Sequence, residues 1–304
     1  MQKPSFDPGL TQKFTLPVTR MINQDGSFNV RRRGVTWRDS HPYLRLINMS
    51  WLGFFASLLA GFLVVNTVFA SLYYMIGTEQ LAGINAPTAF RRFLETFFFS
   101  SQTLTTVGYG GISPRGLAAN ALAALESLCG VLGFAVATGL LFGRVSRPSA
   151  RIGFSRFMLI APYGGGMSLQ FRAVNRRSNS LVELEANVML MTVEPSDDGE
   201  AKRRYQILKL ERERVIFFPL TWTIVHPIDP SSPLYGMTQD DWKRRQAEVL
   251  ILIKAYDDTF SQTVLARHSY RHDEILWDRR FAPAFYVDEQ GDLVLELKKL
   301  GEVV

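Results

Sequence analysis

Two long apolar stretches constrain this chain of 304 residues more than any other feature of its sequence. No residue between Arg45 and Glu79 is charged, and residues 51–76 are almost wholly apolar. The second stretch, residues 117–143, carries a single charge at Glu126. Each stretch is long enough to cross the roughly 30 Å hydrocarbon layer of a membrane as a helix. The sequence therefore predicts two membrane-spanning helices.

Basic residues lie on the terminal side of both stretches, whereas the loop between them carries only Arg91, Arg92 and Arg115. Two spanning helices leave both termini on one side, and basic flanks stay on the inner side of a membrane. We therefore expect a multi-pass protein of the inner cell membrane with both termini in the cytoplasm. The flanking basic residues are Arg31, Arg32, Arg33, Arg38, Arg45, Arg144, Arg147, Arg151 and Arg156.

The formal net charge of +6 fits the same arrangement, because the basic residues cluster where they meet anionic lipid headgroups. We therefore expect membrane lipid, and not nucleic acid, as a partner. The only cysteine, Cys129, lies inside the second apolar stretch, so we expect no disulfide or metal framework. The four histidines are scattered, and no nucleophile–base–acid set is apparent, so an enzyme is not expected.

Two segments precede the first spanning helix. Residues 1–36 predict an extended or disordered cytoplasmic N-terminal segment, with a turn at Asp25-Gly26. Residues 37–49 mix aromatic and aliphatic residues with Arg and Asp, which is typical of a helix lying in the membrane interface. A polar linker is the alternative, because it accommodates Pro42 more easily than a helix does.

After the membrane domain predicted over residues 50–147, the pattern of residues 148–304 changes to alternating apolar and polar positions. Short alternating runs separated by Gly- and Pro-rich turns are typical of a β-sandwich. Such a domain would also suit a second class of function, a cytosolic ligand sensor with a membrane anchor, which would bind ligand and pass no ions. The predicted strands are residues 167–174, 184–193, 204–210, 215–225 and 247–256, and a pair around residues 289–292.

The loop between the two apolar stretches contains FLETFFFSSQTLTTVGYGG. Apolar residues recur there at helical spacing, which predicts a short helix followed by a Gly-containing extended segment. A half-helix that returns to its own side is a re-entrant element, and its irregular backbone needs a cover of protein or water. The apolar residues are Phe93, Leu94, Phe97, Phe98 and Leu104.

The residues that carry the chemistry are Thr106, Val107, Gly108, Tyr109 and Gly110, which form the TVGYG signature of potassium-selective filters. A potassium ion sheds its water only where oxygens replace it, and backbone carbonyls supply them if they point to one axis. Glycines at positions 108 and 110 permit the positive φ that such alignment needs. One chain supplies one column of oxygens, so the sequence predicts a homotetramer with potassium bound at residues 106–109, and no cofactor.

Four segments of the chain resemble the inward rectifier potassium channel family, most closely its prokaryotic, KirBac-type members. They are NQDGSFNV (23–30), SQTLTTVGYG (101–110), TWTIVHPIDPSSPLYG (221–236) and ARHSYRHDEILW (266–277). The last two are long, and potassium channels without this C-terminal domain would not share them. The resemblance implies a membrane α-helical pore domain, with two transmembrane helices and a re-entrant pore helix, followed by a cytoplasmic immunoglobulin-like β-sandwich.

The resemblance also implies roles by position. Phe142 matches the narrowing at the inner helix bundle, where four rings would close the pore; alternatively, it packs between helices. The basic residues would contact anionic headgroups, although the ordinary basic flank of a membrane helix gives the same pattern. These basic residues are Arg38, Arg45, Arg144, Arg147 and Arg151.

Two of three charged positions along the pore depart from the family's strong rectifiers. The cavity position that is Asp in those channels is Phe134 here. Of two acidic positions in the cytoplasmic pore, Glu183 remains and the other is Lys254. A pore without the cavity carboxylate should hold multivalent blockers weakly, so we expect weak rectification.

The filter also lacks familiar supports. Gln102 and Ile112 stand where eukaryotic members have a Glu–Arg ion pair, and Gly111 replaces the Asp that commonly follows the filter. We expect Gln102 to hydrogen-bond the filter backbone and Glu126 to brace the pore helix. Glycines of the second spanning helix either hinge it or allow close helix contact; they are Gly130, Gly133, Gly139 and Gly143.

Overall fold

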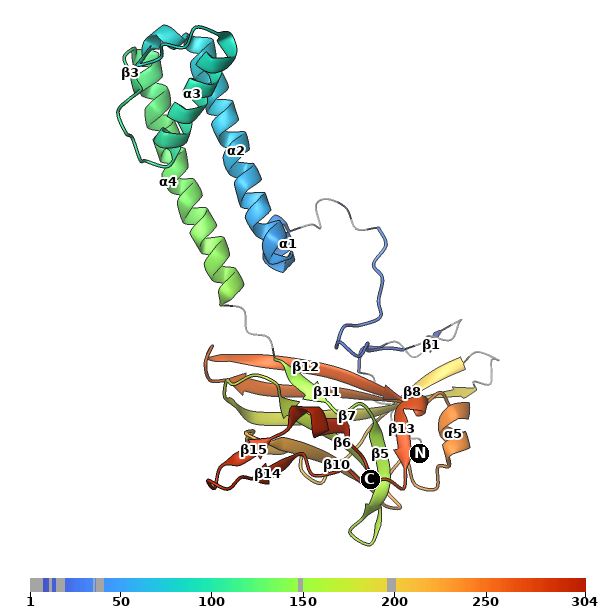
Figure 1. Cartoon of the computed structure of the whole chain (residues 1–304). Helices are drawn as coiled ribbons and strands as arrows, with labels where there is room; N and C mark the ends of the chain where they lie inside the picture. The colour runs from blue at the N-terminus through green and yellow to red at the C-terminus, as the bar shows by residue number, and fades with distance from the viewer. Residues whose placement is uncertain are drawn as a thin grey trace. The chain divides into compact units, whose positions relative to one another are not determined.

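The computed structural model describes residues 8–10, 13–14, 20–34, 36, 41–146, 150–195 and 201–304. The chain forms two compact units, one of Arg33–Arg147 and the other of Met1–Arg32 with Pro148–Val304. The N-terminal residues thus group with the C-terminal unit, whereas the sequence predicts a separate segment over residues 1–36. In Figure 1 the helical unit runs from blue to green, and the β-rich unit runs from green to red, with its N-terminal strand β1 in dark blue.

The helical unit holds two helices that are long and apolar enough to cross a membrane. Their 26 and 29 residues span about 39 and 44 Å at 1.5 Å per residue. These two helices, α2 and α4, run beside each other with the shorter α3 against both (Figure 1). The elements are α1 (Pro42–Asn48), α2 (Trp51–Ile76), η2 (Thr78–Gln80), β2 (Leu81–Ala82), α3 (Ala89–Leu104), β3 (Ser113–Pro114) and α4 (Leu117–Val145).

Local sequence signals explain where these helices begin. Pro42 occupies the first turn of α1, where the missing N–H would be unpaired anyway, so the proline starts the helix instead of preventing it. Ser50 caps α2 by accepting a hydrogen bond from the Gly53 N–H at 3.1 Å. A helix is therefore present over Pro42–Asn48, within the range 37–49 for which the sequence predicts an interfacial helix, and residues 37–40 lie outside the described part of the chain.

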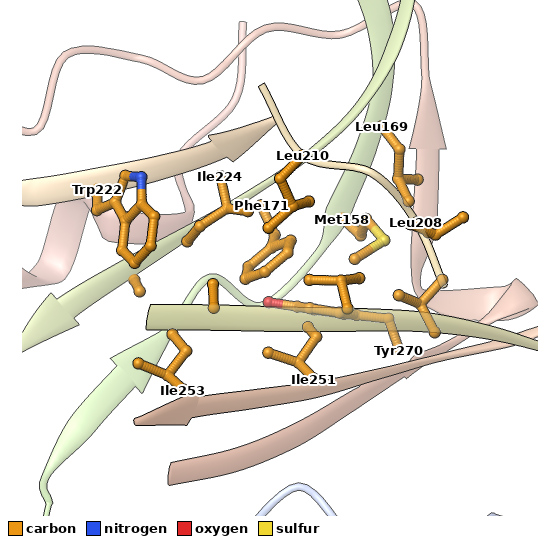
Figure 2. Close-up of a cluster of buried hydrophobic side chains, with 14 of the residues drawn as sticks. Met158, Leu169, Phe171, Leu208, Leu210, Trp222, Ile224, Ile251, Ile253 and Tyr270 are labelled. Carbon is orange, nitrogen blue, oxygen red and sulfur yellow. The ribbon is translucent and has the colours of Figure 1, made fainter. Parts of the chain in front are cut away.

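The β-rich unit contains two sheets with a shared apolar core, which confirms the predicted β-sandwich. One sheet has the order β1-β8-β7-β11-β12 with β9 also paired to β7, and the other has the order β10-β6-β5-β13 with β4 paired to β6. Figure 2 shows side chains of both sheets meeting, including Phe171, Ile251 and Tyr270. Alternate residues of each strand enter this core, which is why period two was visible in the sequence.

The strands of the first sheet are β1 (Lys13–Phe14), β7 (Leu181–Pro195), β8 (Ala201–Ile207), β9 (Arg214–Phe217), β11 (Glu248–Asp257) and β12 (Gln262–Arg271). Those of the second are β4 (Ile152–Phe154), β5 (Met158–Tyr163), β6 (Gly166–Asn175), β10 (Thr221–Ile228) and β13 (Ile275–Trp277). The remaining elements are α5 (Gln239–Arg244), η3 (His272–Glu274), the hairpin β14 (Phe285–Val287) with β15 (Leu293–Leu295), and η4 (Leu297–Gly301).

One predicted strand is wrong. The sequence favours a single strand over residues 215–225, but the chain forms β9 and β10 there, and these two strands belong to different sheets. Pro219 lies between them and has no N–H to continue a ladder, so the chain crosses from one sheet to the other at this point. The predicted pair around residues 289–292 is the hairpin β14–β15.

The N-terminal segment over residues 20–30 folds onto the sandwich. Arg20 forms a 2.9 Å ion pair with Glu274, and the Met21 N–H donates to the Glu248 carboxylate at 3.1 Å. The predicted turn at Asp25-Gly26 closes with the Gly26 N–H on the Asn23 carbonyl at 2.9 Å. Gly26 has φ +81°, and a Cβ there would lie 2.8 Å from the Arg267 carbonyl oxygen, so only glycine fits this contact.

His268 lies beneath this docked segment. Its ring stacks on Phe154 with 4.7 Å between centroids, and its Nδ1 lies 3.3 Å from the Gln24 carbonyl oxygen. Burial lowers the pKa of His268 to about 4, from 6.5 for an unperturbed histidine. The neighbouring charges of Arg20 and Glu274 have smaller and opposite effects on this pKa. The folded sandwich therefore holds this imidazole neutral at neutral pH.

We expect the sandwich to lose stability as the pH falls from 6.5 towards 4. In this window the unfolded chain binds a proton at His268 that the folded chain does not, which costs about 3 kcal/mol once complete. Thermal unfolding of the purified protein at a series of pH values measures the loss. The variant His268→Gln should flatten the dependence of unfolding temperature on pH. The control His272→Gln, in η3 just after β12, should leave that dependence unchanged. Equal profiles for wild type and His268→Gln would contradict the expectation.

Candidate functional site

The segment that follows α3 has an unusual backbone. Positive φ recurs at every second residue, with values of 60° at Thr106, 55° at Gly108 and 80° at Gly110, while the two residues between them have negative φ. In an ordinary strand successive carbonyls point to opposite sides. Alternating the hand of the backbone instead turns successive carbonyls towards one side. The two glycines adopt this conformation freely, but Thr106 is β-branched and is strained there by about 1–3 kcal/mol.

Hydrogen bonds to the end of α3 fix the direction of these carbonyls. The Gln102 carbonyl accepts from the N–H groups of Val107 at 2.9 Å and Gly108 at 3.2 Å. A trans peptide holds its N–H and its C=O on opposite sides. Because both N–H groups point towards α3, the carbonyls of Thr106 and Val107 point away from it. The segment thus presents consecutive oxygens on the side remote from its own helix.

The predicted contact of Gln102 with this segment is present, but it is made by the main chain. Its carbonyl, and not its side-chain amide, accepts the two hydrogen bonds. Residue type at position 102 therefore matters less for this contact than the sequence suggests.

Glu126 lies at the centre of a buried polar cluster in the helical unit. The Tyr73 hydroxyl donates to one carboxylate oxygen at 2.8 Å, and the Ser100 hydroxyl donates to the other. Ser100 also lies 3.1 Å from the amide oxygen of Asn66. These four side chains are fully buried within one chain and come from α2, α3 and α4. Their hydrogen bonds therefore tie the pore helix to both long helices.

The sequence had directed attention to Glu126 alone. Its partners are uncharged polar residues, which are common in membrane helices and attract no attention by themselves. The spacing between the two partners on α2 is the signal that could have identified them. Asn66 and Tyr73 are seven residues apart on α2 and so share one face, which is the face that meets Ser100 and Glu126.

Two glycines of α4 allow close contacts inside the helical unit. A Cβ at Gly130 would lie 1.9 Å from the Leu104 carbonyl oxygen, at the end of α3, and a Cβ at Gly143 would lie 2.7 Å from the Tyr43 hydroxyl of α1. By contrast, a Cβ at Gly133 or Gly139 would meet nothing within 4 Å. Close contact thus accounts for Gly130 and Gly143. Gly133 and Gly139 have open space around them, and no contact explains them.

Arg144 holds α1 against the last turn of α4. Its guanidinium donates to the carbonyls of Leu46 at 3.1 Å and Ile47 at 2.8 Å, and also to that of Met49. The same group lies 4.4 Å from the centre of the Trp51 ring. A cation near the last carbonyls of a helix is favourable, so Arg144 acts as a C-cap for α1.

The other predicted site residues are on the surface of the single chain. Phe134 and Phe142 of α4 have exposed fractions of 76% and 71%. Arg45 on α1 and Arg151 before β4 are exposed, and Arg38 and Arg147 lie outside the described residues. Glu183, at a bulge of β7 with φ 51°, and Lys254 of the neighbouring β11 are exposed as well.

Two membrane-length helices, with a shorter helix and a TVGYG segment between them and a β-sandwich after them, are the features of a potassium channel. The family model described as "Ion channel" matches residues 61–147, and that of the "Inward rectifier potassium channel C-terminal domain" matches residues 152–304. The chain belongs to the inward rectifier potassium channel family and is of the prokaryotic, KirBac type. It is therefore an ion channel and not an enzyme.

Relatives of this chain support the same assignment. Inward rectifier potassium channel Kirbac3.1 of Paramagnetospirillum magnetotacticum is 38% identical, over 93% of this chain and 95% of that protein. ATP-sensitive inward rectifier potassium channel 8 of Mus musculus is 24% identical, over 95% of this chain and 74% of that protein. Inward rectifier potassium channel irk-1 of Caenorhabditis elegans is 25% identical, over 88% of this chain and 53% of that protein.

Removing one member of the Glu126 cluster should destabilise the channel, because a buried polar group would lose its partner. We expect about 1–3 kcal/mol for Glu126→Ala, and less for Tyr73→Phe or Ser100→Ala. The thermal unfolding temperature of the purified channel measures this order. Ser71→Ala is a matched control, since that hydroxyl bonds only the Thr67 carbonyl of its own helix. An equal effect of Ser71→Ala and Ser100→Ala would argue against the cluster.

Proposed function

We propose that four copies of this chain close around one pore, in which residues 106–110 form the potassium-selective filter. The observation that carries the proposal is the alternating backbone of this segment, with its N–H groups bonded back to Gln102 and its carbonyls turned outward. A dehydrated cation needs oxygens of suitable number and field strength around it. Thr106, Val107, Gly108 and Tyr109 supply them by main-chain carbonyls, and Thr106 adds its hydroxyl at the inner end.

The tetramer follows from the same chemistry. One chain offers one column of oxygens, so a cage requires several columns related by a rotation axis. The side chains of Val107 and Tyr109 are 51% and 82% exposed in the single chain, and most of the surface of α2 and α4 is exposed too. Neighbouring copies and lipid would cover these apolar surfaces.

The basic flanks place both chain termini in the cytoplasm and give the channel its lipid contacts. Arg45 and Arg151 are exposed and available to anionic headgroups, with Arg38 and Arg147 as further candidates. Arg144 differs from them, since its guanidinium is bonded to α1. Its part in lipid modulation would be to keep α1 at the end of α4, in addition to any headgroup contact of its own.

The gate would lie at Phe142, near the end of α4. This ring is exposed in the single chain and sits two residues before Arg144. Four such rings around the axis would exclude water and so stop ion flow. Because Arg144 joins α1 to this turn, movement of α1 would bias the gate.

Potassium flux into liposomes containing the purified protein tests the filter directly. We expect rubidium or potassium uptake that barium blocks and that sodium does not share. Gly108→Ala should abolish this uptake while leaving the tetramer assembled, because alanine disfavours the φ of 55° and nothing lies within 4 Å of the new Cβ. Tetramer assembly is followed by size-exclusion chromatography.

Gly61→Ala is the matched control, since Gly61 lies inside α2 and a Cβ there would also meet nothing within 4 Å. Normal uptake by Gly61→Ala shows that an added methyl group in the membrane unit is harmless in itself. Uptake that ignores barium, or that admits sodium equally, would reject the filter.

Weak rectification follows from the side chains along the pore. Phe134 places an apolar ring where a carboxylate would attract multivalent cations, and Lys254 adds positive charge in the sandwich. We expect internal spermine to block outward current weakly. Phe134→Asp should increase spermine affinity at least tenfold, because four carboxylates would then face one cavity of low dielectric constant. Phe134→Asn introduces a side chain of the size of Asp without its charge, and it should not increase spermine affinity. Steep block of the wild type in patch recordings would contradict this.

A further inference from the structure

The segment just beyond the filter is held by a second part of the helical unit. The two short strands β2 and β3 pair there, with Leu81 opposite Pro114 and Ala82 opposite Ser113. The Arg115 N–H also donates to the Gln80 carbonyl at 2.8 Å. We call residues 77–83 together with residues 111–116 the outer brace. It joins the chain after α2 to the chain between the filter and α4.

Within the outer brace, Gly83 lies very close to the main chain of Gly111. Its φ is +93°, and a Cβ on it would lie 2.0 Å from the Gly111 carbonyl oxygen and 3.3 Å from the Ile112 Cα. The three nearest atoms all belong to the main chain, so the closest contacts cannot be relieved by a side chain that swings away. Only glycine therefore allows residues 83 and 111 to approach this closely. Gly111 directly follows Gly110, the last residue of the filter segment.

The outer brace is itself anchored in the core of the helical unit. Leu81 is 3% exposed and belongs to a buried cluster with Phe69, Tyr73 and Phe99. Ile112, the residue after Gly111, packs against the same cluster. The position of Gly83 is therefore set by the packed helices and not by a loose loop.

The two ends of the filter segment are held differently. At the end near α3, the Gln102 carbonyl receives the Val107 and Gly108 N–H groups. Among the described residues, no side chain forms a hydrogen bond with the main chain of residues 109–112. At the other end of the filter segment, after Gly110, the main chain is therefore held by its close contact with Gly83.

We propose that Gly83 is a positioning residue for the outermost potassium site, acting through the main chain of Gly111. This inference rests on the proposed assignment of residues 106–110 as the filter. A side chain at position 83 would push Gly111 and Ile112 away and would pull the Tyr109 and Gly110 carbonyls with them. Oxygens displaced by a few tenths of an ångström no longer match the size of potassium, so discrimination against sodium would fall.

The test compares two glycines of the outer brace in liposomes. Gly83→Ala should raise the sodium-to-potassium uptake ratio at least tenfold and weaken block by external barium at least tenfold. Gly116→Ala should have a smaller effect, because the three atoms nearest to its Cβ belong to the flexible Gln80 side chain, with Oε1 at 2.2 Å. Adding Gln80→Ala to Gly116→Ala should restore the wild-type ratio. Gly61→Ala should match the wild type throughout.

A merely structural role of Gly83 would lower the unfolding temperature without changing the uptake ratio, and that result would overturn the inference. If Gly83→Ala yields no tetramer on its own, channels that combine wild-type and Gly83→Ala subunits decide: a raised uptake ratio supports the inference, and an unchanged ratio overturns it. Failure of the proposed function looks different, because the wild type itself would then lack potassium selectivity and barium block.

Discussion

The arrangement of the helical unit depends on the direction in which the main-chain carbonyls after α3 point. Thr106 and Val107 turn their oxygens away from α3, where no described residue of the same chain donates a hydrogen bond to them. A carbonyl removed from water without a partner is costly. In the proposed channel, a bound cation would replace the lost water, and further copies of the chain would complete the shell of oxygens around it. Ion binding and assembly are in this view two parts of one requirement.

Such a segment cannot keep its own shape, because its strained conformation has no regular hydrogen-bond ladder to support it. Two supports come from the surrounding helices. The Glu126 cluster joins α3 to α2 and α4 on the side of the pore helix, and the outer brace reaches the residues beyond Gly110. Tyr73 belongs to both, since its hydroxyl bonds Glu126 and its ring packs in the cluster that holds Leu81. The proposed filter segment is therefore supported by packed helices and by close main-chain contact, where eukaryotic members of the family are expected to use an ion pair.

The sequence predicted the features that have a period or a signature. The two spanning helices, the pore helix, the sandwich and the glycines at 108 and 110 all follow from local patterns. It missed contacts between distant segments, because polar residues such as Ser100 and Asn66 look the same whether they meet a partner or only their own helix. It also joined β9 to β10, since an apolar run through Pro219 does not reveal that the chain changes sheets. Gly83 carried no signal at all, because its role depends on a carbonyl 28 positions away in the sequence.

The bond between Arg144 and the carbonyls of α1 has a mechanical consequence. A planar guanidinium that donates to three carbonyls resists sliding of α1 along α4 more than a single point charge would. With the proposed gate at Phe142, each subunit that widens the pore must drag its α1 sideways through the headgroup layer. In the proposed tetramer, opening would perform work against the lateral pressure of the bilayer at each of the four subunits. Bilayer thickness and tension would then affect opening even when no particular lipid is bound.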